Sequence, residues 1–237
     1  MKLRVVELLL VSTLPAMVLA KEGLPSLTLT MATLIGGTLA AGSANAFNMV
    51  IEAESDKLMK RTAKRPLATG VLSKTEAVIF ATAIGSLSLI IFQVFTTTLA
   101  TLLTLVAIVF YVWVYTILLK KRTPQNIVWG GAAGCMPALI GWAAVTNSLG
   151  WTPWLLFLLI FLWTPPHFWA LAIKHSDDYK AAGVPMLPVV ESHEKVIASM
   201  VRYTIALTLC SLAVVPVGNM GWVYGISAAV LGGAFLW

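Results

Sequence analysis

Residues 33–56 read TLIGGTLAAGSANAFNMVIEAESD, an apolar run that ends in a polar segment. The apolar half is rich in small residues, which let transmembrane helices approach each other closely in lipid. The polar half spaces Asn48, Glu52 and Asp56 four residues apart, so they share one face of a helix at intervals of about 6 Å. Glu54 does not share that face. This stretch therefore predicts a membrane-spanning helix that carries polar groups where it leaves the bilayer.

The rest of the chain is also dominated by apolar runs. Its 237 residues are 59% hydrophobic and 11% charged, whereas a soluble domain carries about 25% charged residues. Runs long enough to cross a bilayer, about 20 residues each, lie at 5–20, 25–51, 75–97, 99–119, 126–146, 152–172, 197–217 and 221–237. We therefore predict an all-α fold, a polytopic transmembrane helical bundle of about eight spans. Cys135 and Cys210 lie in apolar runs and indicate buried thiols, not a disulfide or metal site.

Basic residues are concentrated in alternate connections between the apolar runs. If the N-terminus is cytoplasmic, 15 of the 16 lysines and arginines lie on the cytoplasmic side, and only Lys21 lies on the other. Cytoplasmic loops of membrane proteins carry an excess of Lys and Arg, so this distribution predicts the orientation. The polar end of the second run then faces the cytoplasm.

The ladder of Asn48, Glu52 and Asp56 is a candidate metal site. Amide and carboxylate oxygens are hard ligands of the kind that Mg²⁺ uses, often together with phosphate groups of a substrate. Polar groups at membrane depth are costly and are usually functional. The alternative is that the acids only solvate a helix end. We expect all three residues to be catalytic residues and metal ligands.

A basic segment follows the ladder directly. Lys60, Arg61 and Arg65 can bind the oxygens of a diphosphate whose charge a metal partly neutralises. The alternative is that this segment orients the chain and contacts anionic lipid headgroups. Because the segment adjoins two carboxylates, we favour a diphosphate site. Lys120, Lys121 and Arg122 lie in the connection after the fourth run, where substrate binding and simple orientation are both reasonable interpretations.

A second polar group follows the sixth run. His167, Lys174 and Asp178 are spaced by seven and four residues, so they share a face if one helix continues past the two prolines before His167. Those prolines are expected to kink or start that helix. We predict Lys174 and Asp178 as catalytic residues, Asp178 as a further metal ligand, and Tyr179 as a substrate-binding residue. His167 could bind porphyrin iron, transfer protons or anchor the helix.

At these residues the chain resembles the intramembrane aromatic prenyltransferases of the UbiA superfamily. Their first motif is Asn-Asp-x-x-Asp-x-x-x-Asp, and here it reads Asn48-Met49-x-x-Glu52-x-x-x-Asp56. Their second motif, Asp-x-x-x-Asp, becomes Lys174-x-x-x-Asp178. The segments 33–48, 56–67, 120–144 and 162–190, above all the strings TPPHFW and PMLPVV, are similar to the haem-modifying branch, the protohaem IX farnesyltransferases. Fewer carboxylates than in the general motifs imply fewer metal ions, or a metal held mostly by diphosphate.

The resemblance implies a function and a cellular setting. It implies transfer of a farnesyl group from farnesyl diphosphate to a vinyl group of haem b, with Mg²⁺ assisting departure of the diphosphate, to give haem O. It also implies a bacterial inner-membrane location, contact with membrane lipid, and haem A synthase or cytochrome oxidase assembly factors as partners, with no nucleic acid. The family fold has nine helices, so we interpret residues 1–237 as one membrane prenyltransferase domain, shortened at one or both ends.

Three other functions fit parts of the pattern. A prenyltransferase of this kind could act on a quinone or chlorin precursor. A secondary transporter could use the acids and His167 as coupling sites, although such sites lie near the bilayer midplane and these acids cluster at one interface. A haem-binding assembly protein would bind porphyrin without forming a product.

Overall fold

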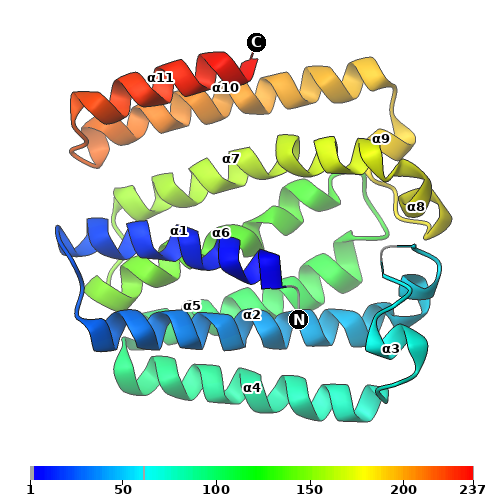
Figure 1. Cartoon of the computed structure of the whole chain (residues 1–237). Helices are drawn as coiled ribbons and strands as arrows, with labels where there is room; N and C mark the ends of the chain where they lie inside the picture. The colour runs from blue at the N-terminus through cyan, green and yellow to red at the C-terminus, as the bar shows by residue number, and fades with distance from the viewer. Residues whose placement is uncertain (1–2, 61, 237) are drawn as a thin grey trace.

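The structure, a computed structural model, describes residues 3–60 and 62–236. Its long helices are α1 (Leu3–Lys21), α2 (Leu27–Lys57), α4 (Lys74–Phe95), α5 (Thr98–Val109) continued by η1 (Phe110–Leu119), α6 (Asn126–Thr146), α7 (Trp151–Lys174), α10 (His193–Val217) and α11 (Trp222–Leu236). The short helices α3 (Pro66–Thr69), α8 (Ser176–Ala181) and α9 (Leu187–Val190) lie in the connections, at one end of the bundle (Figure 1). The described residues form no strand, and the predicted all-α bundle is confirmed.

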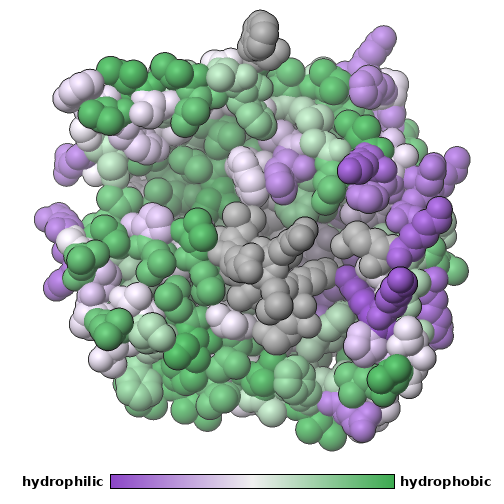
Figure 2. Space-filling view, in the orientation of Figure 1, coloured by the Kyte–Doolittle hydropathy of each residue, from purple (hydrophilic) through white to green (hydrophobic). Residues whose placement is uncertain are grey.

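The outer faces of the bundle are apolar. Six helices of the described chain, α2, α4, α5 with η1, α6, α7 and α10, are long and apolar enough to cross a membrane, whereas the apolar parts of α1 and α11 are shorter. Hydrophobic side chains cover most of the face seen in Figure 2, and hydrophilic ones gather at the end that carries α3, α8 and α9. This one-sided distribution agrees with the orientation expected from the basic connections.

The helices follow one another in space nearly as they do in sequence. α4 packs on α2, α1 lies between α2 and α6, α7 packs on α6, and α10 lies between α7 and α11. α5 and η1 contact both α2 and α6. The C-terminal ends of α2, η1 and α7 therefore meet at the hydrophilic end of the bundle, where α4, α6 and α10 begin (Figure 1).

Small residues and two serines hold α2 against α4. Ser43 Oγ donates a hydrogen bond to the Ala81 carbonyl oxygen at 2.7 Å, and Ser88 Oγ donates to the Gly36 carbonyl oxygen at 2.7 Å. The ring of Phe92 lies directly on Gly36. Interhelical bonds from small polar residues and close backbone approach are what stabilise helix pairs in lipid. The small-residue stripe of α2 therefore packs as predicted along one side.

The segment η1 is a π-helix, in which hydrogen bonds reach back five residues. Thr116 Oγ1 donates to the Tyr111 carbonyl oxygen at 2.8 Å, and the Lys120 backbone N–H donates to the Tyr115 carbonyl oxygen at 2.9 Å. Such segments are rare and occur frequently at functional sites. The wider turn places Thr116 beside α2 and leads into Lys120.

The helix α7 runs without interruption through both prolines, Pro165 and Pro166. The expectation that these residues start the helix is therefore wrong. Neighbouring helices and side-chain hydroxyls can compensate for backbone bonds that proline removes, and Thr164 Oγ1 donates to the Ile160 carbonyl oxygen at 2.8 Å. The expected shared helix holds for His167 and Lys174, which both belong to α7. It is wrong for Asp178, because α7 ends at Lys174 and Asp178 belongs to the separate helix α8.

Two adjacent glycines of α2 provide a matched test of the packing. A Cβ at Gly36 would lie 2.8 Å from the Phe92 ring, whereas a Cβ at Gly37 would meet nothing within 4 Å. Gly36→Ala should lower stability by about 1–3 kcal/mol through overpacking, and Gly37→Ala should leave it unchanged or raise it by about 0.5–1 kcal/mol through helix propensity. Melting temperatures of the detergent-solubilised proteins measure both effects, and equal values would contradict the close α2–α4 contact.

Candidate active site

The three polar residues of the α2 ladder lie on the inner face of the helix. Asn48 is 0% exposed, Glu52 5% and Asp56 3%. Glu54 is exposed and pairs with Lys57, with 2.8 Å between Nζ and Oε2. α2 extends to Lys57, six residues beyond the predicted end of the span, so all three ladder residues belong to one rigid helix. The predicted shared face is confirmed, and burial at the bundle end argues against simple solvation of a helix terminus.

Each ladder carboxylate is paired with a cation from another segment. Lys120, which follows η1, forms an ion pair with Glu52. Arg65, just before α3, donates from Nη1 to Asp56 Oδ2 at 2.6 Å. Both cationic side chains are mostly buried. Burying an unpaired carboxylate is costly, so the two cations compensate for the burial of the ladder acids.

The orientation of the Asn48 amide is fixed by its neighbour on η1. Asn48 Nδ2 lies 3.2 Å from Thr116 Oγ1, and the Thr116 hydroxyl proton is already donated to the Tyr111 carbonyl oxygen. Thr116 can therefore only accept, which turns the Asn48 amine toward it. Asn48 Oδ1 is left buried without a partner among the described residues.

Asn126 organises the connection that carries Lys120. Its Nδ2 donates to the carbonyl oxygens of Lys120 at 3.3 Å and of Thr123 at 2.8 Å. The side chain is 0% exposed, and its Oδ1 has no partner in the described chain. Thr62 Oγ1 similarly donates to the Asp56 carbonyl oxygen at 2.9 Å. The sequence analysis missed Asn126, Thr116 and Thr62, although a buried asparagine at the start of an apolar run is itself a signal.

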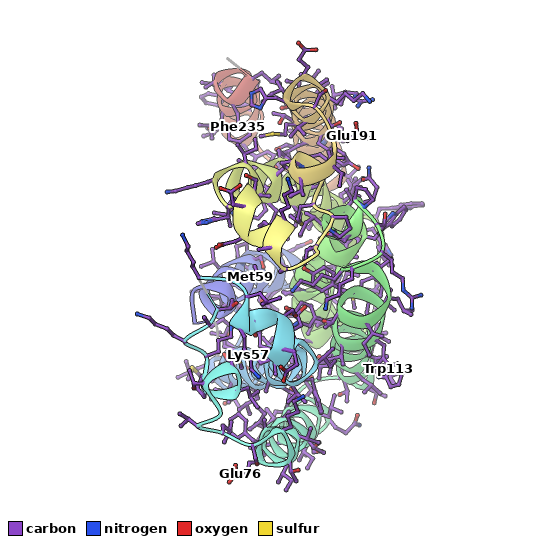
Figure 3. All side chains as sticks on the ribbon, turned by 90° about the vertical axis from the view of Figure 1, so that its right-hand side faces the viewer. Lys57, Met59, Glu76, Trp113, Glu191 and Phe235 are labelled. Atoms are coloured by element: carbon purple, nitrogen blue, oxygen red, sulfur yellow. The ribbon has the colours of Figure 1, made fainter. Side chains whose placement is uncertain are left out.

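The connections after α2 and α7 meet in an apolar cluster at this end of the bundle (Figure 3). Met59 from the first packs with Ala172 of α7 and with Ala182, Val184 and Met186 around α8, and the Tyr179 ring packs against the cluster. The structure therefore brings the two polar segments close together. Their contact consists of packed apolar side chains.

The remaining predicted residues surround this cluster. In the described chain, Lys60, Lys121, Arg122 and Lys174 are exposed, Asp178 is half-buried, and none of the five forms an ion pair. Arg61 lies outside the described residues. These cations are free to meet an anion arriving from solvent.

His167 lies on α7, about five residues deeper in the bundle than Ala172 of the cluster. Its ring stacks on Trp163 with 4.3 Å between centroids and meets the Phe168 ring edge-on at 5.3 Å. The imidazole is exposed and forms no hydrogen bond with the described residues. Its ring is thus held by aromatic contacts with both nitrogens available.

An apolar cavity of about 130 Å³ lies below the ladder, between α1, α2, α5–η1 and α6. Along α2 it runs from Asn45 to Thr33, and small residues leave the space open: Gly37, Ala40, Ala41, Ala44, Ala133 and Gly134. Phe92, Met136 and Ile140 also line it. Part of the small-residue stripe thus lines a cavity, which corrects the expectation that it serves packing alone.

The donor set fits a magnesium ion that is shared with a phosphate substrate. Asn48 Oδ1 is a buried oxygen with no partner in the described chain, and the Glu52 and Asp56 carboxylates follow on the same face. The described residues contain no group of three His, Cys, Asp or Glu side chains placed to hold a metal. Mg²⁺ usually keeps several waters and takes only one or two carboxylates besides phosphate oxygens. An open site of this kind suits it better than a closed protein cage.

The model of the UbiA prenyltransferase family matches residues 9–237. The chain belongs to this family. It is 55% identical over 236 residues to the protoheme IX farnesyltransferase of Leifsonia xyli subsp. xyli, covering 100% of this chain and 77% of that one. It is 54% identical to the protoheme IX farnesyltransferase of Frankia alni, covering 100% of this chain and 82% of that one. The chain is thus a prenyltransferase and an integral membrane protein.

Two solved structures show the same fold. A UbiA homologue from Aeropyrum pernix K1 superposes with a TM-score of 0.79 at 19% identity, over 98% of this chain and 86% of that one. A UbiA homologue from Archaeoglobus fulgidus, bound to GPP and Mg²⁺, superposes with a TM-score of 0.74 at 20% identity, over 99% of this chain and 83% of that one. The helical arrangement is therefore that of the family.

The contact between Asn48 and Thr116 gives a test of the site. Thr116→Val removes the hydroxyl that orients the Asn48 amide, whereas Thr116→Ser keeps it. Loss of an orienting contact of this kind lowers activity by about 10- to 100-fold, so prenyl transfer should fall by that factor in Thr116→Val and recover in Thr116→Ser. Initial rates at equal protein amounts measure this, and equal rates in the two variants would remove Thr116 from the site.

Proposed function

We propose that this chain transfers a farnesyl group from farnesyl diphosphate to a vinyl group of haem b, giving haem O. An identity of 55% to a protein named protoheme IX farnesyltransferase, over 100% of this chain and 77% of that one, supports this donor and acceptor. The observation that carries the chemistry is the buried ladder of Asn48, Glu52 and Asp56, paired with Lys120 and Arg65 above an apolar cavity.

The polar end of the site binds the diphosphate. Asn48 Oδ1, Glu52 and Asp56 would hold Mg²⁺, which when bound neutralises charge on the diphosphate oxygens. Lys120 and Arg65 can exchange their carboxylate partners for phosphate oxygens, and Lys60 and Arg61 extend the same positive surface. Fixed charges aimed at the leaving group stabilise the charge that develops as the C–O bond breaks.

The cavity below binds the hydrocarbon tail. Its wall is mostly apolar and is formed in part by small residues, so it suits an isoprenoid chain. A reactive allylic cation survives only where water is excluded until the acceptor attacks. The vinyl group attacks C1 of the farnesyl group, and water then captures the porphyrin-side cation as a hydroxyl.

The acceptor is positioned from the α7 side. The exposed His167 ring, stacked on Trp163, is available as an axial ligand or orienting group for the porphyrin. Lys121 and Arg122, with Lys120, can bind its propionates. We also assign Lys174, Asp178 and Tyr179 to this wall, with Asp178 as a further oxygen ligand near the diphosphate. The connection after α2 supports this, because its Met59 packs in one cluster with the residues that directly follow α8.

The basic connections also suggest which side of the membrane the site faces. We place the site on the cytoplasmic face of a bacterial inner membrane, because the basic connections gather at that end. We also propose haem A synthase or cytochrome oxidase assembly factors as downstream partners, since haem O is a modified haem that another enzyme must use.

A direct assay tests the donor and acceptor. Membranes that contain the protein, supplied with haem b, farnesyl diphosphate and Mg²⁺, should form haem O, detected by mass spectrometry. The same membranes given 4-hydroxybenzoate or a chlorin in place of haem b should form no prenylated product. Prenylation of either alternative acceptor at a comparable rate, with none of haem b, would overturn the assignment.

Substitution of two acids on opposite faces of α2 tests the role of the ladder. Asp56→Ala removes a buried carboxylate and should lower haem O formation by about 100-fold or more, and added Mg²⁺ should not restore it. Glu54→Ala removes an exposed carboxylate whose ion pairs within residues 3–60 and 62–236 are with the surface lysines Lys57 and Lys74, so its rate should equal that of the wild type. Undiminished product in Asp56→Ala would exclude the metal-site assignment.

A further inference from the structure

Asn45, one helical turn below Asn48 on α2, also carries a buried amide oxygen with no partner among the described residues. The side chain is 5% exposed, and its Nδ2 donates to the Ala41 carbonyl oxygen at 2.8 Å. A backbone carbonyl can only accept, so the amine must face it and Oδ1 must point away. Asn45 Oδ1 is buried without a partner among the described residues, and Asn45 lines the apolar cavity. A buried acceptor with no donor costs about 1–3 kcal/mol and calls for an explanation.

Tyr111 lines the same end of the cavity. α2 and η1 run in the same direction, and the Asn48–Thr116 contact sets their register. Tyr111 lies one π-turn before Thr116, and Asn45 lies one turn before Asn48, so both enter the cavity at similar depth. The Tyr111 hydroxyl forms no hydrogen bond with the described residues. By contrast, the hydroxyls of Thr33 and Thr104 donate to carbonyls of their own helices.

The hydrocarbon tail of a prenyl substrate cannot satisfy these groups. It has no donor for Asn45 Oδ1, so tail binding alone would leave the acceptor buried and unpaired. A water molecule in a protein interior needs two or more polar partners, and Asn45 with Tyr111 supplies two. Both residues line the cavity at the end nearer the ladder.

We propose that Asn45 Oδ1, together with the Tyr111 hydroxyl, binds the water that completes the reaction. This inference rests on the proposed function. The vinyl group forms a C–C bond with C1 of the farnesyl group while the C1–O bond breaks and its electron pair leaves with the diphosphate. Positive charge then resides on the vinyl carbon next to the porphyrin ring. The water oxygen forms a C–O bond to that carbon, and its proton passes to the diphosphate.

The position of Asn45 suits this step. It lies about 4.5 Å along the helix axis from Asn48, between the diphosphate end and the tail cavity, where C1 and the attacking vinyl carbon must meet. By accepting a hydrogen bond from the water, Asn45 Oδ1 turns the oxygen lone pair toward the cation. Without a held water, the cation loses a proton from its neighbouring carbon and becomes an alkene, lighter than haem O by one water.

The experiment measures the ratio of dehydrated to hydroxylated farnesyl porphyrin by mass spectrometry. Asn45→Leu removes the oxygen acceptor at nearly constant size, and it should raise this ratio at least 10-fold while farnesylated porphyrin is still formed. Thr38→Val is the control, on the same helix and outside the cavity. It also removes a side-chain group that donates a hydrogen bond to a carbonyl oxygen of the helix, and it should keep the wild-type ratio. Asn45→Asp retains an oxygen acceptor and should stay near the wild type.

Each turnover gives one product or the other, so the ratio of the two products does not depend on the amount of folded protein. If Asn45→Leu does not fold, Asn45→Ala can be used in its place. Wild-type protein in water labelled with heavy oxygen should place the label in the hydroxyl; an unlabelled hydroxyl would overturn the inference. Haem O formation by the wild type with an unchanged ratio in the Asn45 variants also overturns it, and leaves the proposed function intact. Absence of any farnesyl porphyrin from the wild type refutes the proposed function itself.

Discussion

The site depends on two carboxylates that α2 carries into the interior of the bundle. An ionised acid at that depth is tolerated only if a cation or metal meets it. Glu52 is met by Lys120 from the end of η1, and Asp56 by Arg65 from the segment before α3. Each pair ties a connection to α2, so the charges that suit a diphosphate also fix the loops that surround it.

Helix packing places the apolar cavity directly beside the charged ladder on α2. Close contact of α2 with α4 uses Gly36 and Ser43 on one side of α2 and Gly85 on α4. Gly37 and Ala41, on the adjoining side of α2, line the cavity. One stripe of small residues thus serves both contact and cavity. Because the same helix carries the ladder at its end, the polar groups and the apolar cavity of the proposed site share one rigid element.

Much of this arrangement could be predicted from local pattern. The apolar runs match the observed helices within a few residues, except that α2 continues to Lys57, because a helix does not end where its polar residues begin. The spacing of four residues correctly put the ladder on one face. The prolines before His167 do not start a helix, since neighbouring helices can accommodate them within one. The break at His175 that separates Asp178 from Lys174 has no strong sequence signal.

By itself, the sequence determined the membrane class, the concentration of basic residues in alternate connections, the ladder and the resemblance to the family, because hydropathy, charge and helical spacing are local properties. Only the tertiary structure decided which cation meets which acid, that Thr116 turns the Asn48 amide, and that Asn45 keeps a free oxygen at the head of a cavity. These facts join residues up to 68 positions apart. They depend on how the helices pack against each other, and the sequence periodicity within one helix does not predict that packing.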